Sequence, residues 1–246
     1  PPTLLEVSGI EAVEREVFGP VLHLATYAAR DLDAVMDAIN TRGYGLTFGL
    51  HSRIDARVQH VSEAICAGNI YVNRNQIGAV VGCQPFGGEG LSGTGPKAGG
   101  PLYLPHLEAP PPAPLGPSPW EGTAADPLPP GGLPPAEPRG RDEQLMPGPT
   151  GELNRLARSS RGPVLCLGPG TATAEAQVRA VRALGGDAVA ARGPVAPEAL
   201  TRMPGIAAAV WWGDEAQARA YARALAEREG PIVQLICDAP TAARVL

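Results

Sequence analysis

Apolar and polar positions in the first hundred residues follow two different periods. The segments 17–27 (VFGPVLHLATY), 45–52 (GLTFGLHS) and 69–73 (NIYVN) predict strands bounded by turn residues. Between them, 31–43 and 53–67 carry apolar residues at the i, i+3, i+4, i+7 spacing of amphipathic helices. Strands that alternate with helices predict an α/β arrangement with parallel strands. The two stripes are Leu32, Val35, Met36 and Ile39, and then Ile54, Val58, Val61 and Ile65.

Residues at the helix ends support these boundaries. Asp31 can cap the first helix, because a short carboxylate accepts the free N–H groups of a first turn. Gly43 follows the last apolar position of that helix, and Gly68 stops the second helix.

The last hundred residues repeat the same alternation. Thr171 or Thr173 can cap a helix that runs to Leu184, and an Ala-rich helix is expected over 214–229. Buried-type strands flank these helices, so the sequence predicts a small Rossmann-like α/β unit. These strands are expected at 163–168, 185–191, 205–213 and 231–237.

A stretch rich in proline separates the two periodic regions. Its segments APPPAPLGPSP, DPLPPGGLPPAEPRG and MPGP lack the backbone donors that helices and central strands need. The chain has 31 glycines and 28 prolines, which also indicates long irregular segments. We therefore expect three parts: an α/β part over 1–107, a Pro/Gly-rich linker over 108–150 and the Rossmann-like part over 151–246.

Composition narrows the class of protein. Charged residues make up 18% of the chain and the net charge is −5, so no nucleic-acid-binding surface stands out. No run of about 18 apolar residues is present, and we expect no transmembrane segment. The cysteines share no C-x-x-C spacing and adjoin apolar stretches, so we expect buried, reduced thiols. They are Cys66, Cys83, Cys166 and Cys237.

Two glycine-rich loops are candidate phosphate sites. The first, 88–93 (GEGLSG), fits the G-x-G-x-x-G pattern, but Pro96 and further glycines oppose the helix that must follow such a loop. The second, 168–173 (GPGTAT), has a strand before it and a helix after it. In it Thr173 replaces the third glycine, and Arg192 lies where a ribose-binding acid is expected. The residues leave two readings of this loop: a dinucleotide-binding loop, whose helix N-terminus would hold an anion, and a purely structural turn.

Single polar residues are ambiguous when taken alone. Glu16 at a turn and Lys97 in the glycine-rich loop are each a candidate ligand contact or a solvated side chain. The histidines have no metal-ligand spacing and are expected to be ordinary surface or strand residues, so no metal site is predicted. They are His23, His51, His60 and His106.

Four segments together resemble the C-terminal part of the aldehyde dehydrogenase superfamily. They are EVFGPVLHL, NTRGYGLTFGLHSR, AGNIYVNRNQIGAVVG and QPFGGEGLSGTGPKAGGP, in the order of that family and over nearly all of 1–107. The third and fourth resemble the L-glutamate γ-semialdehyde dehydrogenase (Δ1-pyrroline-5-carboxylate dehydrogenase) branch. The later segment with VLCLGPG is similar to the C-terminal domain of long proline utilization A proteins, which join a flavin-dependent proline dehydrogenase to that activity.

The resemblance implies roles for five residues. Glu16 matches the glutamate that binds the nicotinamide ribose, and Phe18 matches the aromatic near the nicotinamide ring. Gly78 and Ala79 match the loop whose backbone amides hold the α-carboxylate of the aldehyde substrate. Phe86 matches the aromatic that packs on the aliphatic part of the semialdehyde.

The resemblance also implies a reaction and its setting. A cysteine thiolate attacks the semialdehyde, NAD takes the hydride, and water activated by a glutamate releases L-glutamate. None of the four cysteines lies in the nucleophile motif, so we expect no catalytic residue in this chain and no activity of the chain alone. FAD is expected only in a proline dehydrogenase domain outside it.

Expected partners are the small-molecule substrate, the rest of a parent polypeptide and further copies in a homo-oligomer. A bacterial cytoplasmic location is implied, with peripheral membrane contact through the flavin domain as an alternative. Two other readings stay open: a non-catalytic lid or assembly module in 151–246, and an aldehyde dehydrogenase of different specificity.

Overall fold

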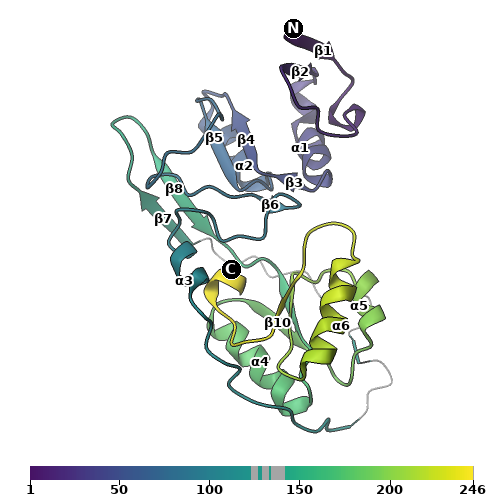
Figure 1. Ribbon diagram of the computed structural model, residues 1–246. Helices are drawn as coiled ribbons and strands as arrows, with labels where there is room; N and C mark the ends of the chain where they lie inside the picture. Colours follow the sequence, from purple (N-terminus) through teal and green to yellow (C-terminus); the bar gives the residue numbers. More distant parts are fainter. Residues whose placement is uncertain (123–126, 129–132, 134–141, 246) are drawn as a thin grey trace. The chain divides into compact units, whose positions relative to one another are not determined.

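The computed structural model describes residues 1–122, 127–128, 133 and 142–245. The chain divides into two compact units, each with its own strands and helices (Figure 1). Unit 1 comprises Pro1–Ile77 and Gly88–Ser92, and unit 2 comprises Gly78–Gly87 and Gly93–Leu246.

Unit 1 is built from small strand pairs and two helices. Strand β1 (Thr3–Glu6) pairs in parallel with β2 (Val21–Leu24), and β4 (Thr47–Leu50) pairs in parallel with β5 (Asn69–Val72). These pairings agree with the predicted α/β arrangement. The other elements are 3-10 turns at Ile10–Ala12 and Ala29–Asp31, helices α1 (Leu32–Thr41) and α2 (Asp55–Ala64), and the antiparallel pair of β3 (Tyr44–Gly45) with β6 (Glu89–Gly90).

The apolar stripes of α1 and α2 form the core of unit 1. Met36 of α1 is buried with Val61 of α2 and with Ile65 just beyond it, and β4 packs against this cluster. Ile54 departs from the prediction, because α2 begins at Asp55 and leaves Ile54 52% exposed before the first turn.

The predicted cap of α1 is also wrong in its detail. Asp31 precedes α1, but its side chain accepts no N–H from the first turn. The 3-10 turn Ala29–Asp31 runs into the helix and gives Asp31 a φ of −97° and a ψ of 11°. A capping side chain needs an extended backbone at that residue, and the 3-10 turn prevents it.

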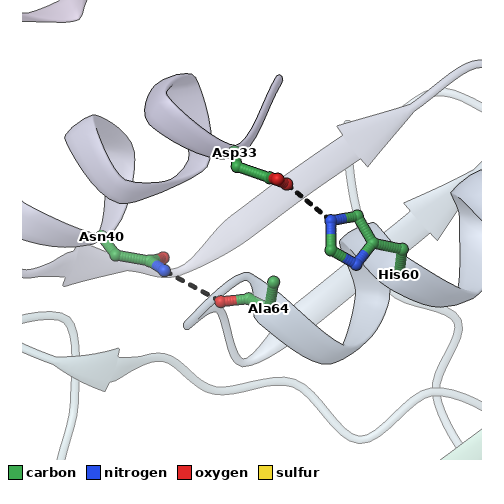
Figure 2. A network of polar contacts seen from close by, with 4 residues as sticks. All are labelled: Asp33, Asn40, His60 and Ala64. Atoms are coloured by element: carbon green, nitrogen blue, oxygen red, sulfur yellow. Dashed lines mark hydrogen bonds and ion pairs between the residues drawn. The ribbon is translucent and has the colours of Figure 1, made fainter. Parts of the chain in front are cut away.

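Polar side chains join α1 to α2 (Figure 2). The Asn40 amide nitrogen donates to the Ala64 carbonyl at 2.8 Å, and its oxygen accepts the Cys66 N–H at 2.9 Å. Carbonyls in the last turn of a helix lack partners within the helix, so Asn40 satisfies one of them. In the same pair of helices, His60 Nε2 lies 2.6 Å from Asp33 Oδ1, with both side chains more than half exposed.

Unit 2 contains a parallel four-stranded sheet with the strand order β10-β9-β11-β12. The chain builds outward from β9, first to β10 on one side and then to β11 and β12 on the other, in agreement with the predicted α/β arrangement of parallel strands. Its elements are α3 (Tyr103–Leu107), β7 (Asp142–Met146), β8 (Asn154–Arg158), β9 (Pro163–Cys166), α4 (Thr171–Ala183), β10 (Asp187–Ala190), α5 (Pro197–Arg202), β11 (Ala208–Val210), α6 (Glu215–Ala226), β12 (Gln234–Ile236) and α7 (Ala242–Val245).

Residues along β9 alternate between two hydrophobic clusters. Leu165 and Leu167 enter a cluster that includes residues of α5 and α6. Val164 and Cys166 enter a second cluster with residues of α4 and α7. Because successive side chains of a strand point to opposite faces, the sheet is buried on both sides.

Three local features of unit 2 differ from the sequence-based expectation. Helix α4 begins at Thr171 with Gly170 at the N-cap position, so neither threonine caps it. Strand β7 lies inside the stretch predicted to be a linker, because 142–146 (DEQLM) contains no proline, and it pairs in an antiparallel hairpin with β8, which lies beyond that stretch. Short helix α5 was not predicted. Residues 123–126, 129–132 and 134–141 of the predicted linker lie outside the described residues.

The contacts of Asn40 yield a stability prediction. Replacement of Asn40 by Ala removes two hydrogen bonds, the one that the Ala64 carbonyl accepts and the one that the Cys66 N–H donates. We expect a loss of about 1–3 kcal/mol in unfolding free energy, measured by urea unfolding followed by far-UV circular dichroism. The control is His60→Ala, which removes an exposed pair and should cost less than about 0.5 kcal/mol. Equal losses of unfolding free energy in the two variants would contradict the stabilising role of the Asn40 hydrogen bonds.

Candidate functional site

Glu16 and Phe18 lie in unit 1, in the connection before β2. The Glu16 carboxylate is exposed, and no side chain in the described part of the chain pairs with it. Phe18 is 89% exposed. Arg42, just after α1, donates to the carbonyls of Val13 (2.8 Å) and Glu14 (3.2 Å), which fixes the backbone that leads to these two residues.

Gly78 and Ala79 lie in unit 2, at the start of a loop that closes on itself. The Val80 N–H donates to Gln84 Oε1 at 3.0 Å, and the Gln84 N–H donates back to the Val80 carbonyl at 2.9 Å. Among the described residues, none accepts the N–H groups of Gly78 and Ala79. A Cβ added at Gly78 would meet nothing within 4 Å. Gly78 is exposed and Ala79 is half-buried, so two consecutive backbone donors without an acceptor among the described residues lie beside the hydrogen-bonded Val80.

Gln84 organises this loop, although the sequence analysis did not single it out. Its side-chain oxygen holds Val80, while its nitrogen donates to Glu152 and to Asn154 Oδ1 (3.2 Å), at the turn of the β7–β8 hairpin. Asn154 in turn donates to the Pro147 carbonyl at 3.0 Å. These partners are about seventy positions away along the chain, so no local sequence signal could have revealed the role of Gln84.

Phe86 is the third predicted substrate contact, and it lies in the same unit as Gly78 and Ala79. Its backbone forms an antiparallel bridge with Ala98, with N–H···O distances of 3.0 and 2.9 Å. This bridge holds the Phe86 side chain in a half-buried position. Lys97 beside it donates to the Gly87 carbonyl at 3.0 Å, so the lysine ammonium braces the loop.

The glycine-rich segment 88–93 has a packing role. Gly90 in β6 has a φ of 62°, and a Cβ there would overlap the carbonyl oxygen of Gly43 next to β3. The next helix, α3, starts only at Tyr103. Without a helix N-terminus directly after it, this segment lacks the donors of a phosphate loop.

The second glycine loop, 168–173, has the expected strand before it and helix after it. It connects β9 to α4, and the buried side chain of Gln177 in α4 holds it. Gln177 Oε1 accepts the Gly168 N–H at 2.9 Å, and Gln177 Nε2 donates to the Gly168 carbonyl at 2.6 Å.

Unit 1 also has an open pocket of about 460 Å³ where β4 and β5 end and α2 begins. Within its lining, Ser52 and Asn73 are joined by reciprocal hydrogen bonds of 3.0 and 2.9 Å. None of the five predicted site residues lines this pocket. Its lining consists of His51, Ser52, Arg53, Ile54, Arg57 and Asn73.

The cysteines differ in burial, which corrects the expectation that all four are buried. Cys66 and Cys237 are exposed because they follow the ends of α2 and β12, and Cys83 is half-buried. Only Cys166, within β9, is buried, and this burial raises the pKa of its thiol to about 12 against the opposing charge of Arg182. A thiol that stays protonated at neutral pH is no nucleophile. No helix in the described residues is long and apolar enough to cross a membrane.

Comparison with known proteins identifies the class to which the first part of the chain belongs. Residues 1–107 match the model of the aldehyde dehydrogenase family, so this segment is a member of that family. The match covers the positions of Glu16, Phe18, Gly78, Ala79 and Phe86.

Nearly the whole chain is homologous to bifunctional PutA proteins. It is 38% identical to the bifunctional protein PutA of Escherichia coli over 95% of this chain and 21% of that protein. It is 60% identical to PutA of Rhizobium meliloti over 46% of this chain and 9% of that protein. It is also 45% identical to the 1-pyrroline-5-carboxylate dehydrogenase of Bacillus subtilis, over 39% of this chain and 19% of that protein. The chain thus spans about a fifth of the E. coli relative.

Burial of Cys166 predicts selective thiol chemistry. In the native chain at about pH 8, iodoacetamide should modify the exposed Cys66 and leave Cys166 unmodified, because only the thiolate reacts and Cys166 is protonated and inaccessible. Mass spectrometry of tryptic peptides measures the modified fraction of Cys66 and of Cys166. Unfolding in urea is the control and should make the two sites equally reactive. Equal modification in the native chain would contradict the burial.

Proposed function

We propose that this chain is part of an NAD-dependent L-glutamate γ-semialdehyde dehydrogenase of the PutA type, which oxidises the semialdehyde to glutamate in proline catabolism. The observation that carries the proposal is the homology to PutA along nearly the whole chain, together with the family match of residues 1–107. In this proposal, 1–107 is the C-terminal part of the catalytic domain, 108–150 a linker and 151–246 a Rossmann-like accessory domain.

Gly78 and Ala79 form the substrate anchor in this proposal. Their two adjacent N–H groups can donate to one carboxylate, as the α-carboxylate of the semialdehyde requires. The open space at Gly78 supports the assignment, since a ligand needs that room. The flanking Val80 N–H is already bound to Gln84, so donation to a ligand is confined to the two anchor residues.

In the same proposal, Phe86 provides the apolar contact to the substrate. The bridge to Ala98 fixes its backbone, and its half-buried ring can cover the methylene groups of the semialdehyde. A carboxylate anchor combined with an aromatic cover suits a substrate that is charged at one end and aliphatic in the middle.

Glu16 and Phe18 fit a nicotinamide nucleotide by the chemistry of their side chains. An exposed carboxylate with no partner among the described residues can accept both hydroxyl donors of a ribose. Phe18, 89% exposed, offers an aromatic face to the adjoining ring. NAD, when bound, supplies the hydride acceptor; the contribution of this chain is to bind and orient it.

The chain contributes binding groups, and the nucleophile is expected elsewhere in the parent polypeptide. Cys166 is buried and protonated, and the other three cysteines lie outside the family's nucleophile motif. FAD would belong to the proline dehydrogenase part, which we also expect outside this chain.

The purified 246-residue chain should therefore be inactive. With NAD and L-glutamate γ-semialdehyde, we expect no NADH above the rate without protein, measured by absorbance. The matched control is the complete enzyme that contains this segment, assayed in parallel. NADH production by the chain alone would overturn its role as a partial, binding-only segment.

Replacement of Phe86 by Ala tests the substrate assignment in that complete enzyme. Loss of the aromatic cover should raise the KM for the semialdehyde about tenfold and change kcat little, because ground-state and transition-state contacts are lost together. Steady-state kinetics measures both. Leu145→Ala, at an exposed position of β7, is the control and should change neither. If the aldehyde is a different one, the KM for the semialdehyde stays unchanged in Phe86→Ala.

A further inference from the structure

A proline-rich segment of unit 2 lies across the ends of its parallel strands. We call residues 111–121 the strap; Figure 1 shows it as the teal segment that leaves α3 and passes along α4. The Ala239 N–H, beyond the end of β12, donates to the Pro111 carbonyl at 3.1 Å. The Ser118 N–H donates to the Pro169 carbonyl, beyond the end of β9, at 3.0 Å. The strap thus contacts the loops that follow two strands of the same sheet.

The strap reaches the position where sheets of this type bind ligands. The chain leaves β9 toward β10 on one side, while β11 lies on the other side of β9. Ligands of open parallel sheets bind outside the carboxyl ends of the strands at such a switch point. The donors there are the N–H groups in the first turn of α4, which have no partner within the helix.

Groups of the strap occupy those donors. The Thr171 N–H donates to the Pro119 carbonyl at 3.1 Å, and the Thr173 N–H donates to the Ser118 hydroxyl oxygen at 3.2 Å. The contact also runs the other way, since the Glu121 N–H donates to the Thr171 hydroxyl at 2.8 Å. A carbonyl and a hydroxyl oxygen therefore stand where the oxygens of an anion would stand.

Thr173 explains why the glycine pattern of this loop is broken. It occupies the third glycine position of 168–173, and its side chain is fully buried. Its hydroxyl donates to the Gly116 carbonyl at 2.7 Å, and its oxygen lies 3.1 Å from that of Ser118. A glycine there would leave the strap without this polar contact.

Close packing makes the fit between strap and loop specific. Gly170 has a φ of 93°, and a Cβ there would overlap the Ser118 carbonyl oxygen. Trp120 packs against the cluster that contains Leu165 and Leu167, and its ring lies 3.3 Å from the Cβ position of Gly168.

We propose that the strap is a built-in occupant of the nucleotide-type crevice in unit 2, with Ser118 and Pro119 in the place of a ligand's phosphate oxygens. The crevice is closed by the chain's own backbone, and unit 2 takes no dinucleotide there. This proposal does not depend on the dehydrogenase activity, and it explains physically how a Rossmann-like sheet serves a purely structural role.

Amide hydrogen exchange of the full 246-residue chain, resolved by residue with NMR, tests the strap contact. The Thr171 amide should exchange at least about tenfold more slowly than the Glu215 amide, since it has an acceptor in the strap. Glu215 is the matched control: it is the first residue of α6, and no described residue accepts its N–H. Equal exchange at the two positions would overturn the proposal.

A pair of glycine variants tests the packing. Gly170→Ala and Gly185→Ala introduce the same unfavourable positive φ (93° and 87°), but only the Cβ at Gly170 meets the strap. The Trp120 indole N–H resonance should shift in Gly170→Ala and stay unchanged in Gly185→Ala. An unchanged Trp120 resonance in both variants would contradict the proposal. If Gly170→Ala fails to fold while Gly185→Ala folds, the excess cost supports it.

Titration of the same unmodified chain with NAD and with inorganic pyrophosphate tests whether the strap closes the crevice of unit 2 to ligands. The amide resonances of 171–173 should not move. Saturable shifts at these residues with either probe would overturn the proposal. Shifts confined to the neighbourhood of Glu16 would agree with the strap proposal and also support the NAD assignment in unit 1. A lack of shifts there would count against the NAD assignment only.

Discussion

Burial of β9 on both faces is the constraint on which unit 2 depends. Leu165 and Leu167 enter one cluster while Val164 and Cys166 enter the other, so each contributes to only one side of the sheet. Fully buried aliphatic side chains of this kind stabilise a fold by about 1.5–3 kcal/mol each. Since β9 is central, the loop that follows it meets the crossover helix α4 at the carboxyl edge, and the strap and Gln177 are arranged around that loop.

Unit 2 uses backbone donors in two opposite ways. At the start of α4 the chain supplies its own acceptors, so the first-turn amides are satisfied internally. At Gly78 and Ala79 two neighbouring amides are left without an acceptor among the described residues, while Gln84 holds the next one. Backbone N–H groups are strong donors that need a partner when they are withdrawn from water. The proposed substrate anchor agrees with this difference: an amide pair left open can serve a substrate, and an occupied one cannot.

The glycine-rich stretches show how a motif depends on its surroundings. Segments 88–93 and 168–173 both approach the dinucleotide fingerprint, yet neither presents free helix donors. In the first segment, Gly90 is needed because β3 and β6 approach closely. No helix follows that segment directly, so no helix N-terminus supplies donors there. In the second, the helix is present, but a segment about fifty residues earlier covers it. The first outcome follows from nearby prolines and glycines, whereas the second depends on a long-range contact.

The sequence by itself determined the periodic elements. The sequence predicts the strands at 163–166, 187–190 and 234–236 from short apolar runs, which a strand buried on both faces leaves in the sequence. It predicts α1 from the apolar stripe of a helix buried on one face. The candidate residues Glu16, Phe18, Gly78, Ala79 and Phe86 came from the resemblance of sequence segments to the aldehyde dehydrogenase superfamily. Their roles remain proposals.

Only the tertiary structure decided how the irregular segments are used. It revealed the hydrogen bond by which Gln84 fixes the loop after Gly78 and Ala79, the pairing of β7 with β8, and the contact of the proline-rich strap with α4. These features join residues tens of positions apart through single polar contacts. Proline content predicts that a segment is neither helix nor central strand, but the surface on which it packs is set by the free donors and the shape of a distant helix end.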